Sequence, residues 1–68
     1  MVGYGGSGLM DEEQRHLDMA RRFAAVLGKT LHVYTEYRGG RRCYVFASEG
    51  SPTHRQAESR RLTRIATY

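Results

Sequence analysis

The stretch Thr30–Ser48, TLHVYTEYRGGRRCYVFAS, decides the fold of this 68-residue chain. On both sides of Gly39-Gly40 it is rich in β-branched and aromatic residues, which favour strands. Two glycines between such runs predict a tight hairpin turn, because the turns that match strand twist need positive φ at both central positions. We therefore expect antiparallel strands at residues 30–38 and 41–48.

A two-residue turn also predicts the register of these strands. It places Arg38 opposite Arg41 and Val33 opposite Phe46. A one-residue bulge at Arg41 would shift the pairing, and the sequence leaves that alternative open. In the first register one face carries Leu31, Val33, Tyr37, Tyr44 and Phe46, and the other carries His32, Tyr34, Glu36, Cys43, Val45 and Ala47. Because both faces carry apolar side chains, each needs a cover.

The segment before the hairpin has helical periodicity. Asp11 with Gln14 three residues later resembles a capping box, and Gly28 suits the left-handed position that follows a helix. The residues that recur on one helical face are Leu17, Ala20, Phe23, Ala24 and Leu27. We expect a helix over 11–27 that covers one face of the hairpin, preceded by a flexible glycine-rich tail over 1–10.

The segment after the hairpin predicts a second, short and basic helix. Ser51 before Pro52 is one candidate start, and Thr53 with Gln56 is another. Within residues 54–66 a thin apolar stripe is formed by Ala57, Leu62, Ile65 and Ala66.

The predicted architecture is a single small α+β domain over residues 11–68 with the element order α-β-β-α. An antiparallel β-hairpin packs on an N-terminal helix, and a short basic helix closes the chain. A two-stranded sheet alone is marginal in water, and its edges carry unpaired backbone groups. A homodimer formed through the hairpin edges is one expected remedy, and addition to a partner's sheet is the other.

The charge is unevenly distributed. The chain carries 11 basic and 7 acidic residues, for a net charge of +4. Residues 1–29 carry equal numbers of basic and acidic groups, so the whole excess of positive charge falls in residues 30–68. The basic residues of that second part are all arginines. Arginine suits carboxylate and phosphate recognition because its guanidinium is a planar fork of donors. A GC-rich genome, which favours arginine codons, would explain the same bias without any function.

Two arginine clusters are the candidate binding features. Arginines flank the hairpin turn, where two glycines allow close approach to a surface, and others crowd the final helix with little acidic compensation. Aromatic residues of the hairpin lie beside them, where they could stack on a partner, although core packing explains most aromatics of this kind. The residues predicted to contact a partner or a nucleic acid are Arg38, Arg41, Arg42, Arg55, Arg60, Arg61, Arg64, Tyr34 and Tyr44.

The sequence offers no catalytic set and no metal or cofactor motif. Cys43 is the only cysteine, so no disulfide within the chain is expected, and His16, His32 and His54 lack the spacing of zinc ligands. No apolar run is long enough to cross a membrane, and no secretory signal is visible. We expect a cytoplasmic protein without cofactor, metal or small-molecule substrate, and not an enzyme.

Two functions follow as expectations. The first is a small basic inhibitor or regulator of the kind that phages and mobile elements encode, docking on an acidic surface of a host complex such as a CRISPR effector or an RNA polymerase. The alternative is a small nucleic-acid-binding regulator that uses the hairpin tip and the arginine-rich helix. The modest net charge of +4 favours the first expectation.

Overall fold

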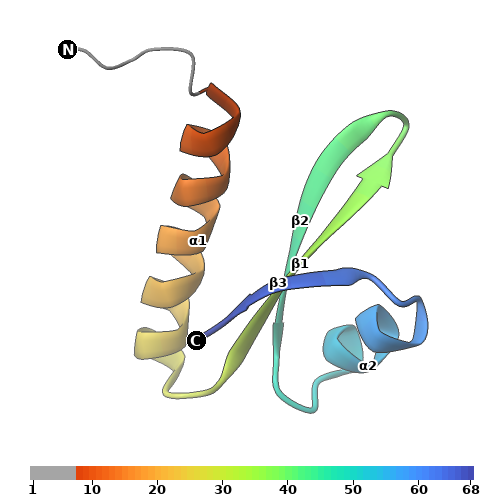
Figure 1. The fold of residues 1–68 in the computed structure, drawn as a ribbon. Coiled ribbons are helices and arrows are strands. Elements are labelled where there is room, and N and C mark those ends of the chain that lie inside the picture. The colour runs from red at the N-terminus through yellow and green to blue at the C-terminus, as the bar shows by residue number, and fades with distance from the viewer. Residues whose placement is uncertain (1–7) are drawn as a thin grey trace, which may run out of the picture.

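A computed structural model describes the chain from Gly8 to Tyr68 (Figure 1). The order of elements is helix α1 (Gly8–Leu27), strands β1 (Leu31–Arg38) and β2 (Arg41–Ser48), helix α2 (Pro52–Ser59) and strand β3 (Thr63–Thr67). The three strands form one antiparallel sheet in the order β2-β1-β3. The small α+β class is confirmed, with the topology α-β-β-α-β.

The hairpin has the register expected of a two-residue turn. Val33 lies opposite Phe46 and Arg38 opposite Arg41, without a bulge at Arg41. Gly39 and Gly40 have φ values of +56° and +78°, which most residues adopt only with strain. The two glycines therefore determine which side chains share a face of the sheet.

The two faces of the sheet are covered by different helices. On one face, α1 packs Ala20 and Ala24 against Leu31 and Val33. On the other face, α2 packs Ala57 against Tyr34 and Ala47. The sheet is the middle layer, with α1 and α2 on opposite sides of it (Figure 1).

Strand β3 corrects the prediction of a helix that reaches residue 66. The second helix starts as the first alternative proposed, because the Ser51 side chain accepts a hydrogen bond from the backbone N–H of His54. It ends at Ser59, and Arg61 then takes up a left-handed conformation with φ of +58°. The chain turns back, and β3 pairs with the outer edge of β1. Of the two hairpin edges considered for dimerisation, that of β2 alone remains unpaired among residues 8–68.

A β-bulge in β3 explains how two neighbouring apolar residues of this strand pack on the same face of the sheet. Val33 pairs with Ala66 and Tyr34 pairs with Arg64, so Ile65 is the extra residue. Both Ile65 and Ala66 consequently pack on the α1 side of the sheet. Arg64 keeps its side chain among the groups of the α2 side.

Helix α1 differs from its prediction at both ends. It begins at Gly8, so Asp11 lies inside the helix rather than at its start. Of the tail expected over residues 1–10, residues 8–10 belong to α1, and residues 1–7 lie outside the described residues. At the other end, Phe23 and Leu27 are half exposed although the periodicity places them on the apolar face. Neither of the described helices has the length and the apolar character needed to span a bilayer.

Candidate functional site

The tip of the hairpin extends beyond the rest of the sheet. Strand β3 pairs with β1 only as far as Thr35, so the strands continue as a two-stranded ribbon towards the glycine turn (Figure 1). On this ribbon Tyr37 lies opposite Arg42, and its side chain is 73% exposed. The ribbon therefore presents an aromatic ring and three arginines on a narrow support.

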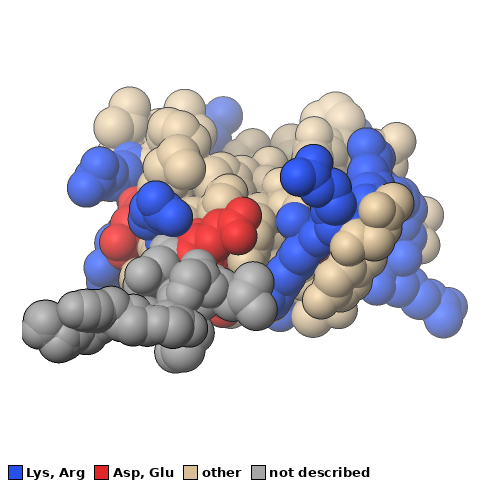
Figure 2. All heavy atoms as spheres, turned by 90° about the horizontal axis from the view of Figure 1, so that it is seen from above, with Lys and Arg blue, Asp and Glu red and all other residues tan. Residues whose placement is uncertain are grey.

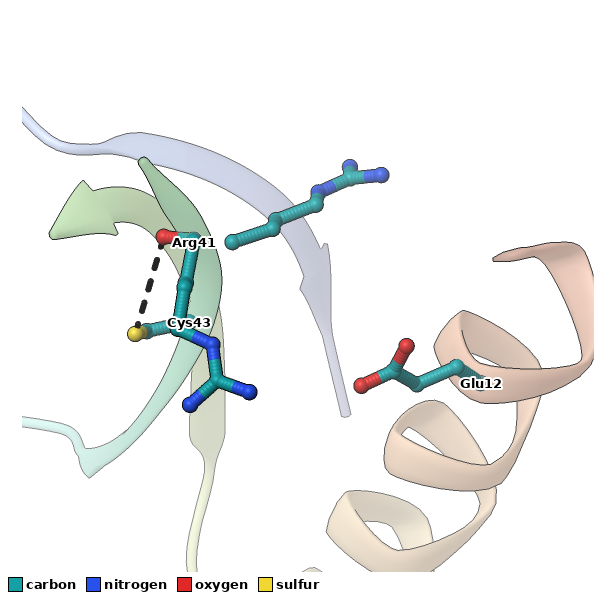
Figure 3. A pocket seen from close by; sticks show the side chains of 4 residues that line it. Glu12, Arg41 and Cys43 are labelled. Carbon is teal, nitrogen blue, oxygen red and sulfur yellow. Dashed lines mark hydrogen bonds between the residues drawn. The ribbon is translucent and has the colours of Figure 1, made fainter. Parts of the chain in front are cut away.

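A groove separates this ribbon from the first turns of α1. It has a volume of about 490 Å³ and is lined by Glu12, Arg41, Arg42 and Cys43. Glu12 lies on α1, across the groove from Arg41 and Cys43 on β2 (Figure 3). The Cys43 thiol donates a weak hydrogen bond to the carbonyl of Arg41 within the ribbon, at 3.8 Å.

Tyr44 and Arg42 connect β2 with α1. The ring of Tyr44 stacks on His16 with centroids 4.1 Å apart. The Arg42 guanidinium lies 5.5 Å from the centre of the Tyr44 ring and 3.1 Å from Glu13. Tyr44 is thus half-buried in an intramolecular stack, and Arg42 is partly neutralised by α1.

Other predicted site arginines also lie close to the protein's own carboxylates. Glu36 accepts a 2.7 Å hydrogen bond from Arg60 and lies 3.8 Å from Arg38. Glu58 lies 4.0 Å from Arg64. With Arg42, four of the seven arginines therefore share three carboxylates, those of Glu13, Glu36 and Glu58.

Three predicted site arginines have no carboxylate within 4 Å among the described residues. Arg55 donates to the backbone carbonyl of Gly50 at 2.8 Å, so its guanidinium caps a turn. Arg41 lies at the ribbon tip, and Arg61 lies in the left-handed turn after α2. Viewed from the tip, the charged side chains in sight on the hairpin side of the molecule are basic, whereas both signs occur over α1 (Figure 2).

Tyr34 does not lie with the arginines at the surface. Its side chain is fully buried between the sheet and α2, and its hydroxyl donates a 2.5 Å hydrogen bond to Glu58. Burial, followed by this bond, raises the pKa of Tyr34 to about 12. Its prediction as a contact residue is wrong, because no partner can reach a ring covered on both sides.

Sequence reasoning missed a polar cluster that surrounds Tyr34 on the α2 side of the sheet. His32 is buried, and its Nε2 lies 2.6 Å from Oε1 of Glu49. Its Nδ1 lies 3.3 Å from the Thr67 hydroxyl and 3.5 Å from Arg64. The His54 ring stacks on His32 with centroids 4.3 Å apart.

The hydrogen bonds of the cluster show that one nitrogen of His54 accepts a hydrogen bond, and they lower the pKa values of both carboxylates. The backbone N–H of Gly50 donates to Nδ1 of His54, so this nitrogen is an acceptor and carries no proton. The hydrogen bond from His32 holds the pKa of Glu49 below its ordinary value, and the bond from Tyr34 does the same for Glu58. The cluster therefore contains two ionised carboxylates beside two imidazoles and one arginine.

The geometry of the cluster argues against a shared metal ion. One ligand atom from each of His32, Glu49 and His54 lies within 4.8 Å of the others, which is close enough for coordination. An imidazole nitrogen binds a metal in the plane of its ring, however, and these two rings are stacked with only 11° between their planes. Lone pairs that lie in two nearly parallel, separated ring planes do not converge on one ion. The 2.6 Å contact between His32 and Glu49 is also a hydrogen-bond distance, shorter than the separation of two ligands around zinc.

A structural role explains the cluster better than a catalytic one. Both nitrogens of His32 face protein groups, and the ring is buried. The contacts join β1 to the β2–α2 turn, to α2 and to β3. The bonded residues are 17, 24 and 35 positions apart in sequence. These contacts stabilise the packing of the second helix and the third strand on a small sheet that has little apolar area of its own.

Comparison of the chain with family models, with curated proteins and with solved structures gives no significant match.

Proposed function

We propose that this chain is a small non-catalytic binding protein that docks through the ribbon tip on an acidic surface of a protein partner. The observation that carries the proposal is the tip itself. It projects beyond β3, it exposes Tyr37, and its Arg41 has no carboxylate within 4 Å among the described residues. Exposed tyrosine and arginine are the side chains that contribute most often to binding energy at protein interfaces.

The distribution of acidic residues favours a protein partner over a nucleic acid. Glu13 and Glu36 lie beside the tip arginines, and Glu12 faces them across the groove. A continuous phosphate backbone would meet these carboxylates as well as the arginines, which lowers its affinity. Separate carboxylates on a protein surface can pair with single guanidinium groups and avoid the acidic positions.

The biological role that suits such a surface is inhibition or regulation. A small docking protein of the kind found in phages and mobile elements acts by occupying a surface, and it needs no catalytic group. The partner would be a host complex with an acidic patch at a functional contact, such as a CRISPR effector or an RNA polymerase. Arg38, Arg41 and Arg42 at the tip would form the centre of the contact, and Arg61 would extend it.

Nucleic-acid binding is the second candidate, because one observation favours it. Tyr37 and Arg42 lie directly opposite each other on an exposed β-ribbon, and such ribbons enter the major groove or stack on bases. The double substitution Arg38→Glu with Arg41→Glu should abolish binding in either case. Arg22→Glu on α1 makes the same type of charge change away from the tip, and it is the control.

The experiment combines capture from a host lysate with direct titration. For the proposed function, wild type and Arg22→Glu retain one defined protein partner, which the double variant loses. A nucleic-acid binder instead gives a linear decrease of log affinity with log salt for DNA or RNA. Equal capture by the double variant and by wild type would remove the ribbon tip from the interface and overturn the proposal.

A further inference from the structure

The two edges of the sheet differ in their protection against strand addition. The β3 edge is five residues long and carries the bulge at Ile65, which interrupts pairing. The β2 edge is eight residues long and regular, and it contains no proline, lysine or bulge. Natural proteins protect long edge strands by such features or by charged side chains. The charged residues of β2, Arg41 and Arg42, lie at its tip end, and residues 43–48 carry none of these features.

The backbone groups that β2 offers can be assigned from the ladder. Glu49 N–H donates to the carbonyl of Thr30, and bonded pairs alternate along an antiparallel ladder. Val45 therefore exchanges hydrogen bonds with Tyr34. The backbone N–H and C=O groups of Tyr44 and Phe46 consequently point away from β1 and have no strand partner among residues 8–68.

The side chains along this edge remain only partly covered. Residues 43–46 are apolar or aromatic and are all partly exposed. Their incomplete burial is expected of a strand with a neighbour on one side only. An added strand would cover them from the open side.

We propose that β2 pairs antiparallel with β2 of a second copy of this chain, with Val45 on the two-fold axis. Only registers that pair outward-pointing residues with one another are compatible with the ladder. Centring on Val45 places Tyr44 beside Phe46 of the second copy, and it places Arg41 beside Glu49 of the second copy. The three-stranded sheet of each copy becomes half of a continuous six-stranded sheet.

Charge and apolar character select this register over its neighbours. Centring on Tyr44 would place Arg42 against Phe46 and Arg41 against Ala47, which leaves two charged groups beside apolar ones. Centring on Phe46 would place Cys43 against Glu49. The Val45 register alone pairs apolar residues with apolar residues and sets each Arg41 opposite a carboxylate that is 62% exposed.

The proposed dimer and the proposed docking surface share only part of the ribbon. Tyr37 and Arg38 belong to β1 and lie one strand away from the new pairing. Arg41 and Arg42 take part in both, so the variants that test the dimer leave the arginines unchanged.

Opposite charges placed at Ser48 test the pairing and its register. In the Val45 register Ser48 lies opposite Arg42 of the second copy, so Ser48→Glu adds attraction and Ser48→Arg adds repulsion. Because the symmetry applies each change twice, we expect the dimer dissociation constant to move by roughly tenfold in opposite directions. Sedimentation equilibrium over a range of concentrations measures it. Both substitutions occupy one site, so a general loss of folding would not give opposite signs.

Disulfide trapping tests the two-fold position. Facing residues of a non-bonded antiparallel pair have Cα atoms about 4.5 Å apart, within the range of a disulfide. Val45→Cys in a Cys43→Ser background should form a covalent dimer on mild oxidation. Wild-type Cys43 should not, because it faces Ala47 of the second copy. A monomer at all concentrations to about 1 mM, a dimer insensitive to the Ser48 pair, or cross-linking through Cys43 would each overturn the proposal.

Discussion

The hydroxyl of Tyr34 on β1 donates a 2.5 Å hydrogen bond to Oε2 of Glu58 on α2. Tyr34 is the largest fully buried side chain in the described part of the protein, whereas Glu58 is half exposed on the surface of its helix. The bond therefore joins the centre of the sheet to the outer side of the layer that covers it. In a chain with one small core on each face, we expect this contact to have a measurable share in stability.

Replacing Tyr34 with phenylalanine isolates that share. The ring and its packing against Ala57 remain, and only the hydroxyl is lost. A hydrogen bond to a charged acceptor contributes about 1.5–3 kcal/mol. Because Glu58 is half exposed, we expect the free energy of unfolding to fall by about 1–2 kcal/mol. Chemical denaturation measures it. Tyr37→Phe is the control, because that exposed side chain should change stability by less than about 0.5 kcal/mol. Equal effects of the two substitutions would contradict the role given to Tyr34.

Alkaline pH should destabilise the protein through the same residue. The pKa of Tyr34 is about 12 in the folded protein against an ordinary value of 10.0, because burial and the Glu58 carboxylate disfavour the phenolate. A raised folded pKa means that the contribution is complete below pH 10 and is lost as the pH rises towards 12. Ultraviolet titration should show one tyrosine ionising in that upper range. Tyr34→Phe should remove this component, and its persistence would refute the assignment.

The strands of the hairpin and their register could be predicted because the signals are local. Two glycines require one kind of turn, and the turn then determines every pair up to Leu31 and Ser48. The third strand could not be predicted in this way. Leu62, Ile65 and Ala66 have the spacing of a helical face, and no glycine marks the left-handed break, because Arg61 occupies it. The alternation of Thr63, Ile65 and Thr67 was the available sign of a strand.

The polar cluster was beyond sequence reasoning for a different reason. His32, Glu49, His54 and Thr67 meet only after α2 and β3 have both returned to β1. No short-range spacing connects them. The sequence also could not show that Glu36 lies between Arg38 and Arg60, because that arrangement depends on where the end of α2 packs against β1.

Acid should destabilise the protein through the two carboxylates of the cluster. The pKa values of Glu49 and Glu58 are lowered, chiefly by the hydrogen bonds from His32 and Tyr34. A depressed folded pKa contributes stability that is present above the ordinary carboxylate range and is lost as the pH falls through the folded value. The denaturation midpoint should therefore decrease below about pH 5, and Glu49→Gln with Glu58→Gln should flatten this dependence. Glu12→Gln, which makes neither contact, is the control, and an unchanged slope in the double variant would contradict the prediction.

Arg61→Gly should stabilise the protein. Arg61 N–H donates to the carbonyl of Glu58 and Leu62 N–H donates to that of Ala57, which is the hydrogen-bond pattern of a helix end that favours glycine at the Arg61 position. A residue with a Cβ at φ of +58° costs about 1 kcal/mol there, so the free energy of unfolding should rise by that amount.

Arg61→Ala separates the backbone from the charge. It removes the same guanidinium from the neighbourhood of Arg60 and Arg64 but keeps the Cβ, so it should not stabilise. If alanine stabilised as much as glycine, relief of charge repulsion and not of backbone strain would be the cause. Strained residues are retained more often at functional positions than elsewhere. If the Arg61 guanidinium contacts the partner, the glycine and alanine variants should weaken its capture equally. A glycine variant that is more stable and captures the partner as well as wild type would show that Arg61 is not part of the docking surface.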